Sequence, residues 1–126
     1  MNAVPGVGIL ELSLPTDPAL ALTARVFAGA LTEHLDQAAP EDLKLAFSEL
    51  LAAAVDVGAD SVEFRVDLER AEVEVRGAGP LGAAGAEGLE EHERFARIHR
   101  EDLLSALFPG LHLRDGVLVL PLRATA

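Results

Sequence analysis

The chain has 126 residues, a net charge of −11 and no cysteine, which excludes a disulfide framework and a thiolate metal site. Half of the residues are apolar, so the chain can form one hydrophobic core and is not disordered. The ten Lys and Arg residues are scattered among 21 acids, which argues against direct nucleic-acid binding, since that needs a clustered basic face. Without a basic leader or a membrane-length apolar run, the sequence predicts one cytoplasmic domain, residues 1–126, with no membrane partner.

The first predicted elements are a strand and a helix. Residues 8–15 (GILELSLP) alternate between apolar and polar side chains, which predicts a strand with one buried face. Residues 16–18 (TDP) can cap and begin a helix. Apolar residues then recur at helical spacing as far as Leu35, which predicts an amphipathic helix of about five turns.

A second helix and a hairpin follow. Pro40, with two acids after it, suits a helix start, and Gly58 is a natural stop. The apolar stripe of this helix has five members: Leu43, Phe47, Leu50, Leu51 and Ala54. Residues 61–68 and 71–77 alternate between apolar and charged side chains, which predicts two strands joined by a tight turn at residues 69–70.

The remainder of the chain predicts a loop, a helix and a closing hairpin. Residues 77–88 (GAGPLGAAGAEG) have almost no large side chains and predict a flexible loop. Residues 89–108 predict a third helix, and a break near His99 is left open. The pair at 115–116 (DG) is a strong hairpin-turn signal before the last strand. This order of elements predicts an α/β fold, a two-layer sandwich in which about three helices cover one face of a mixed or antiparallel sheet.

Three patterns that could carry chemistry fail on their context. Residues 77–82 (GAGPLG) satisfy the dinucleotide-binding spacing G-x-G-x-x-G, but no helix opens on the third glycine. His92 and His99 are seven residues apart, too far along a helix to bind one zinc ion, so we interpret them as surface residues. No serine lies in a G-x-S-x-G nucleophile elbow.

One carboxylate, Glu49, interrupts the otherwise apolar second helix. At about 3.6 residues per turn it lies roughly 100–200° from the centre of the apolar stripe. Periodicity alone therefore predicts a solvated acid at the edge or on the outside of the helix. If this is all that Glu49 does, we expect its removal to change the free energy of unfolding by roughly a few tenths of a kcal/mol.

The stretch APEDLKLAFSELLAAAV, residues 39–55, resembles the N-box helix of GHKL (Bergerat-fold) ATPases, and most closely that of the small serine-kinase anti-sigma factors. Their helix has an acid-rich start followed by S-E-x-x-T-N-A-[IV], and residues 48–55 (SELLAAAV) align with it without gaps. The elements on both sides also resemble the family, so the resemblance covers nearly the whole chain. It implies a histidine-kinase-ATPase-like Bergerat fold, with Glu49 at the position of the catalytic general base.

Several positions depart from the motifs of that family. Ala53 replaces the asparagine that ligates Mg²⁺, and a methyl group cannot ligate a hard cation. Gly77, or Arg76 if the alignment shifts by one, replaces the aspartate that accepts the adenine amino group. Gly79 and Gly82 resemble glycines that would contact a nucleotide, but nearby acids would oppose an anionic phosphate. These losses imply a degenerate member with a vestigial base, no useful ATP or Mg²⁺ binding and no bound metal.

The resemblance implies a regulatory protein-binding module of the anti-sigma, partner-switching type. Its partner would be a sigma factor, a STAS anti-anti-sigma protein or another GHKL protein, and the chain would form a homo- or heterodimer. Arg25 matches an arginine that family members use to contact partners, while a solvated arginine is at least as ordinary an interpretation. The alternative is an active ATP-dependent protein serine kinase with divergent nucleotide contacts, which would use Glu49 as its base and bind ATP at Gly79 and Gly82.

Overall fold

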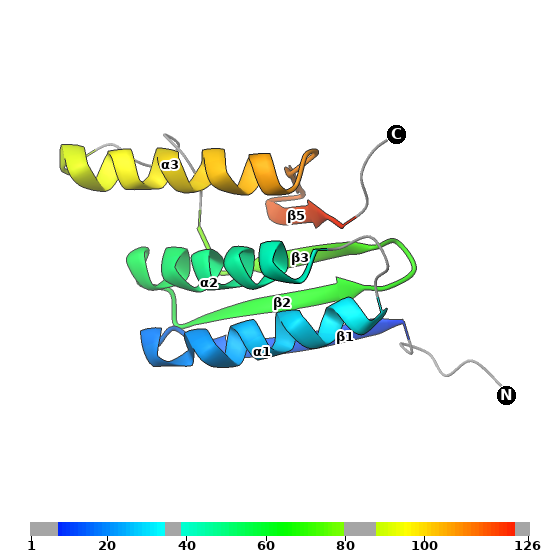
Figure 1. The fold of residues 1–126 in the computed structure, drawn as a ribbon. Coiled ribbons are helices and arrows are strands. Elements are labelled where there is room, and N and C mark those ends of the chain that lie inside the picture. The colour runs from blue at the N-terminus through cyan, green and yellow to red at the C-terminus, as the bar shows by residue number, and fades with distance from the viewer. Residues whose placement is uncertain (1–7, 35–38, 80–87, 123–126) are drawn as a thin grey trace, which may run out of the picture.

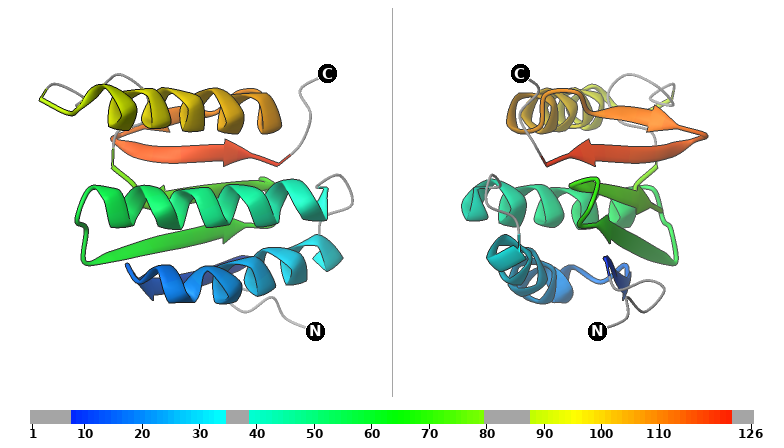
Figure 2. Two further views of the ribbon diagram at one scale, coloured as in Figure 1. Left: turned by 60° about the vertical axis from the view of Figure 1, so that its left-hand side comes forward. Right: turned by 90° about the vertical axis from the view of Figure 1, so that its right-hand side faces the viewer.

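The computed structural model describes residues 8–34, 39–79 and 88–122, which form an open five-stranded antiparallel sheet and three α-helices. The elements are β1 (Ile9–Pro15), α1 (Ala21–Leu31), α2 (Pro40–Asp56), β2 (Ser61–Asp67), β3 (Glu72–Arg76), α3 (Glu91–Leu107), β4 (His112–Arg114) and β5 (Val117–Pro121). The strand order is β1-β2-β3-β5-β4. The helices lie side by side on one face of the sheet, with α2 in the middle (Figure 1, Figure 2). The predicted α/β sandwich of two layers is therefore confirmed, and its sheet is antiparallel.

The first helical segment is divided into three parts. Short 3₁₀ turns, Pro18–Leu20 and Thr32–His34, flank the 11 residues of α1, so the predicted five turns do not form one continuous α-helix. A side-chain oxygen of Asp17 accepts the backbone N–H of Ala19 at 2.9 Å, which caps the first turn. The predicted last member of the stripe, Leu35, lies outside the described residues.

The core lies between the helices and the inner face of the sheet. All five members of the predicted α2 stripe are buried there, as are the inward residues of β2 and β3. The ring of Phe47 on α2 stacks on that of Phe64 on β2, with centroids 4.3 Å apart. The alternation of apolar residues in the strands and their helical spacing in α2 thus predicted two sides of the same core.

The two hairpin turns differ from each other in how well the sequence predicted them. Asp115 and Gly116 have φ values of 53° and 79°, so the last hairpin has the predicted two-residue turn. The tight turn predicted at residues 69–70 is wrong, because β2 and β3 are joined by four residues, 68–71. The side chain of Asp67 accepts the backbone N–H groups of the two residues at 69–70, each at 3.0 Å, and this stabilises the longer turn.

Helix α3 is continuous from Glu91 to Leu107, without a break near His99. It contains no glycine or proline that would interrupt the backbone hydrogen bonds. Leu104 is its one buried residue, and the side chains of residues 91–96 are exposed. The structure describes no helix with the length and apolar character of a membrane span.

The face of the sheet that lies away from the three helices carries charged side chains. Arg65 on β2 pairs with Glu74 on β3 at 3.4 Å, and a terminal nitrogen of Arg114 donates to Glu72 at 2.8 Å and to Glu74 at 3.2 Å. The hydrogen bonds that the Arg114 guanidinium donates to Glu72 and Glu74 hold its pKa above the usual value. Alternation therefore gives the sheet one apolar and one ionic face.

Candidate functional site

Glu49 lies on the side of α2 that faces α3, where it is held by an arginine. The Nε of Arg100 donates to Oε2 of Glu49 at 3.1 Å, and a terminal nitrogen of the same guanidinium donates to Oδ2 of Asp56, also at 3.1 Å. The Arg100 side chain is 12% exposed and that of Glu49 is 32% exposed. Glu49 is therefore a partly exposed residue at the edge of the buried stripe, where periodicity predicted it, and it also takes part in the contact between α2 and α3.

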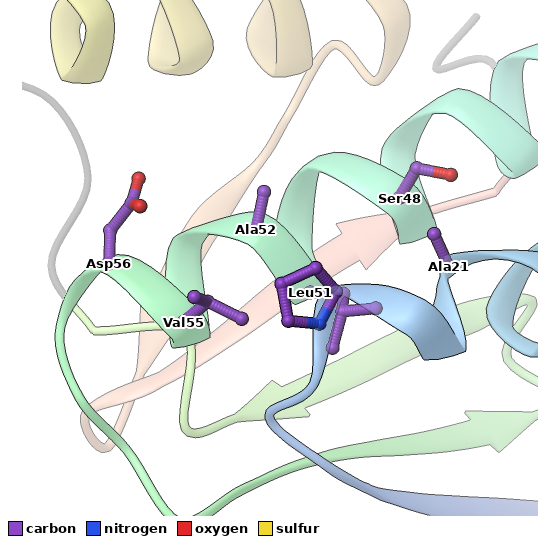
Figure 3. A pocket seen from close by; sticks show the side chains of 7 residues that line it. Ala21, Ser48, Leu51, Ala52, Val55 and Asp56 are labelled. Carbon is purple, nitrogen blue, oxygen red and sulfur yellow. The ribbon is translucent and has the colours of Figure 1, made fainter.

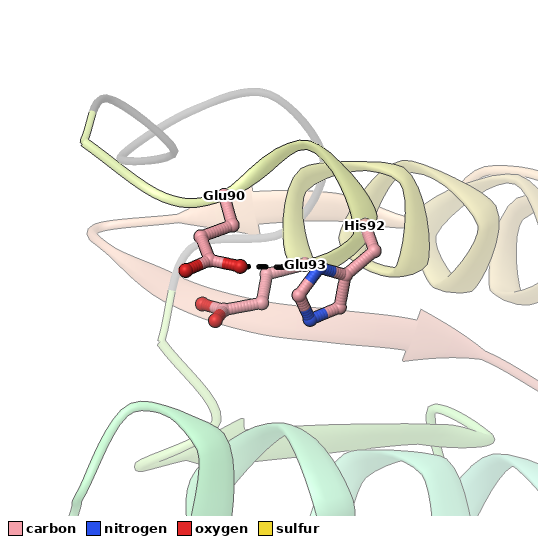
Figure 4. Close-up of side chains that lie close together, drawn as sticks. All are labelled: Glu90, His92 and Glu93. Atoms are coloured by element: carbon pink, nitrogen blue, oxygen red, sulfur yellow. Dashed lines mark ion pairs between the residues drawn. The ribbon is translucent and has the colours of Figure 1, made fainter.

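The position of the family's metal ligand offers no donor atom. Ala53, one turn after Glu49, is 2% exposed and packs in the core. The described side chains that could together hold a metal are elsewhere, at the start of α3 (Figure 4): ligand atoms of Glu90, His92 and Glu93 lie within 4.8 Å of one another. All three residues are exposed, as the sequence predicted for His92, and a fully exposed cluster of this kind is common without a metal.

The glycines at the end of β3 have a backbone reason to be glycine. Gly77 has a φ of +96°, and a Cβ atom there would lie 2.2 Å from the carbonyl oxygen of Ser61. Gly79 has a φ of +75°, and its Cβ would lie 2.8 Å from a methyl carbon of Val57. No carboxylate can therefore occupy position 77 in this backbone. Gly82, the other predicted nucleotide contact, lies outside the described residues.

A pocket of about 230 Å³ lies between the end of α2 and the start of α3, close to Gly79. Its lining is mixed in charge and consists of Asp56, Val57, Leu89, His92, Glu93, Ala96 and Arg97. Pockets that enclose drug-sized ligands usually measure roughly 300–1,000 Å³. This pocket is smaller, and among the described residues that line it there is neither Glu49 nor Ala53.

Arg25 lies on the exposed side of α1, away from the core. It makes no ion pair or side-chain hydrogen bond within the described part of the chain, whereas every other Lys and Arg there has a polar partner. Its neighbours Leu22 and Val26 are 69% and 64% exposed. We call these three residues the α1 face. Sequence reasoning missed the two apolar members, although both lie off the buried stripe at helical spacing.

A second feature that the sequence did not predict is a groove between the start of α1 and α2 (Figure 3). Its volume is about 230 Å³, and it is lined by Pro18, Ala21, Ser48, Leu51, Ala52, Val55 and Asp56. The hydroxyl oxygen of Ser48 is buried and has no hydrogen-bond partner among the described residues. We call this feature the α1–α2 groove.

Neither a model of a known protein family nor a curated protein matches this chain. The likeness to GHKL ATPases therefore rests on the residues of the sequence itself.

Proposed function

We propose that the chain is a cytoplasmic regulatory protein-binding module of the anti-sigma, partner-switching type, built on a degenerate GHKL (Bergerat) fold. Its partner is a sigma factor, a STAS anti-anti-sigma protein or another GHKL protein, bound by a homo- or heterodimer. The observation that carries the proposal is Arg25, a cation with no partner among the described residues that lies between two exposed apolar side chains. In a chain with 21 acids and ten Lys and Arg residues, a cation without a partner is unusual.

The composition of the α1 face suits a protein interface. Arginine is enriched at interface hot spots, and a central pairing works best when apolar side chains around it exclude water. Leu22 and Val26 would provide this exclusion on either side of Arg25. The net charge of −11 favours approach of a partner region that is basic overall, within which one carboxylate would pair with Arg25.

Three features argue against the alternative, an active protein serine kinase. The carboxylate of Glu49 is engaged by Arg100, while a general base must be free to accept a proton from its substrate. Ala53 supplies no ligand for the Mg²⁺ that would bridge the phosphates. The backbone at Gly77 has no room for the family's adenine-binding carboxylate.

The proposal is tested by capturing partners from the source cells with the wild-type chain and with two charge reversals. Arg25→Glu should abolish capture of the specific partner, because the reversed charge would face the partner's carboxylate. Arg94→Glu makes the same change in net charge on α3, at a side chain whose hydrogen bond is to the backbone oxygen of Leu89, and should retain the partner. Equal capture by both variants, or no specific partner for the wild type, would overturn the proposal.

A further inference from the structure

The α1–α2 groove has an apolar floor open to the same side of the molecule as the three helices (Figure 3). Pro18 and Ala21 form one wall, and Leu51, Ala52 and Val55 form the other. Small residues on both helices leave this space, because neither Ala21 nor Ala52 has a side chain long enough to fill it. An open apolar hollow on a protein surface favours a ligand with an apolar group of matching size.

The volume of the groove decides which class of ligand fits. At about 230 Å³ it lies below the roughly 300–1,000 Å³ of pockets that enclose drug-sized molecules, so a nucleotide or a large cofactor would not be enclosed. A single side chain from another protein needs less room. The exposed Leu22 and Val26 lie within one helical turn of Arg25 on α1 and add apolar surface that a protein partner could cover.

Polar groups beside the groove further limit its occupant. Arg25 comes one helical turn after the groove residue Ala21, on the same side of α1, and has no partner within the described residues. A carboxylate on the occupying segment would therefore meet a free guanidinium. The hydroxyl of Ser48 also lacks a partner, and rotation about its Cα–Cβ bond would let it donate to a carbonyl oxygen of that segment.

We propose that the α1–α2 groove receives one aliphatic side chain of the protein partner, while a carboxylate on the same partner segment pairs with Arg25. This inference rests on the proposed function and adds the chemistry of the recognised segment: an aliphatic residue with an acidic residue close to it. The aliphatic side chain loses water in the groove, and the ion pair sets the direction of the segment along α1.

The groove itself is tested without a partner, by titrating isobutanol into the ¹⁵N-labelled full chain. Isobutanol matches a leucine side chain and adds a hydroxyl that can bond to Ser48. We expect saturable shift changes at the amides of Ala21, Ser48 and Ala52, with a Kd of roughly tens of millimolar. Ala52→Phe should weaken this binding by at least about tenfold, because the phenyl ring occupies the space that isobutanol would take. Ala106→Phe makes the same change at an exposed position of α3 and should leave binding intact.

A second experiment tests the groove with the protein partner itself. A photo-cross-linking residue at Leu22 captures the partner from source-cell lysate, and the captured protein is then purified and titrated against the variants. We expect Ala52→Phe to weaken its binding at least about tenfold and Ala106→Phe to leave it unchanged. A purified partner that binds both variants equally would overturn the groove inference and leave the proposed function standing. Isobutanol shifts that do not saturate, or that survive Ala52→Phe, would also overturn it. Failure to obtain any partner that binds the purified chain would overturn the proposed function, and the inference with it.

Discussion

Two helices of this molecule each carry a charged side chain beside apolar residues, and the two charges have opposite surroundings. Glu49 on α2 is held by Arg100 of α3, which also holds Asp56. Arg25 on α1 has no partner within the described chain and stands between exposed apolar residues. The role of a charge within an apolar pattern therefore depends on the groups that face it in the fold. The first charge joins two helices, and the second is available to another protein.

The same contrast separates stability from recognition. Changes on the side of α2 that faces α3, or at the glycines beside it, should lower the free energy of unfolding. Changes at the α1 face should leave that free energy nearly unchanged and act on binding alone, since exposed positions without internal partners usually contribute within about 0.5 kcal/mol.

Gly77→Asp introduces a carboxylate at the end of β3 and should be the most damaging change. The added Cβ would meet the backbone oxygen of Ser61, so we expect a loss of more than about 3 kcal/mol in urea unfolding, or no folded protein. Gly58→Asp is the matched control, because Gly58 also has a positive φ, +72°, but open space around its Cβ position. It should cost only about 1 kcal/mol. Similar stability of both variants would contradict the close approach.

Arg100→Met keeps the aliphatic part of the side chain and removes the cation that joins two carboxylates of α2. Because Glu49 and Asp56 would then repel each other without a partner, we expect a loss of about 2 kcal/mol in the free energy of unfolding. Arg94→Met, on the exposed start of α3, should change stability by less than about 0.5 kcal/mol. Equal losses in urea unfolding would show that helix α3 does not depend on Arg100.

Glu49→Gln keeps the shape of the side chain and removes its charge. We expect a loss of about 1 kcal/mol, more than the few tenths predicted for a solvated acid, because the Arg100 guanidinium at 3.1 Å then donates to a neutral amide oxygen in place of a carboxylate. In the double variant with Arg100→Met, the Glu49→Gln loss should largely disappear, since the two residues act as one contact. Strict additivity of the two unfolding free energies would refute that coupling.

Ser48→Ala should have the smallest effect and the opposite sign. It removes a buried hydroxyl that has no hydrogen-bond partner among the described residues, and alanine is the better helix former. We expect a gain of up to about 1 kcal/mol in thermal or urea unfolding. Ser105→Ala, exposed on α3, measures the helix-propensity part alone, at about 0.5 kcal/mol. A loss of stability at Ser48 would mean that its hydroxyl has a partner after all.

Local patterns in the sequence predicted most of the fold, because their causes are local. The alternating strands, the buried stripe of α2 and the turn at Asp115 depend on neighbours within a few residues. The turn after β2 was predicted two residues too short, since periodicity does not show that Asp67 caps a longer turn.

The candidate site was harder to predict, because its causes are distant in the chain. Arg100 is 51 residues from Glu49 in the sequence. The carbonyl oxygen of Ser61, at the start of β2, leaves no room for a side chain at Gly77, which follows the neighbouring strand β3. That Arg25 has no partner among the described residues depends on all its neighbours in space, so no local pattern can show it. The α1–α2 groove likewise exists because small residues from two helices face each other.

Thermal unfolding of the chain with increasing Mg-ATP most directly tests the central claim, that the molecule acts by recognition at α1 rather than by phosphoryl transfer at α2. We predict that the midpoint of thermal unfolding in millimolar Mg-ATP is the same as in sodium sulfate of equal ionic strength. A ligand that binds only the folded state adds RT ln(1 + [L]/Kd) to stability. A saturable rise of the midpoint with Mg-ATP, absent with sulfate, would contradict the account.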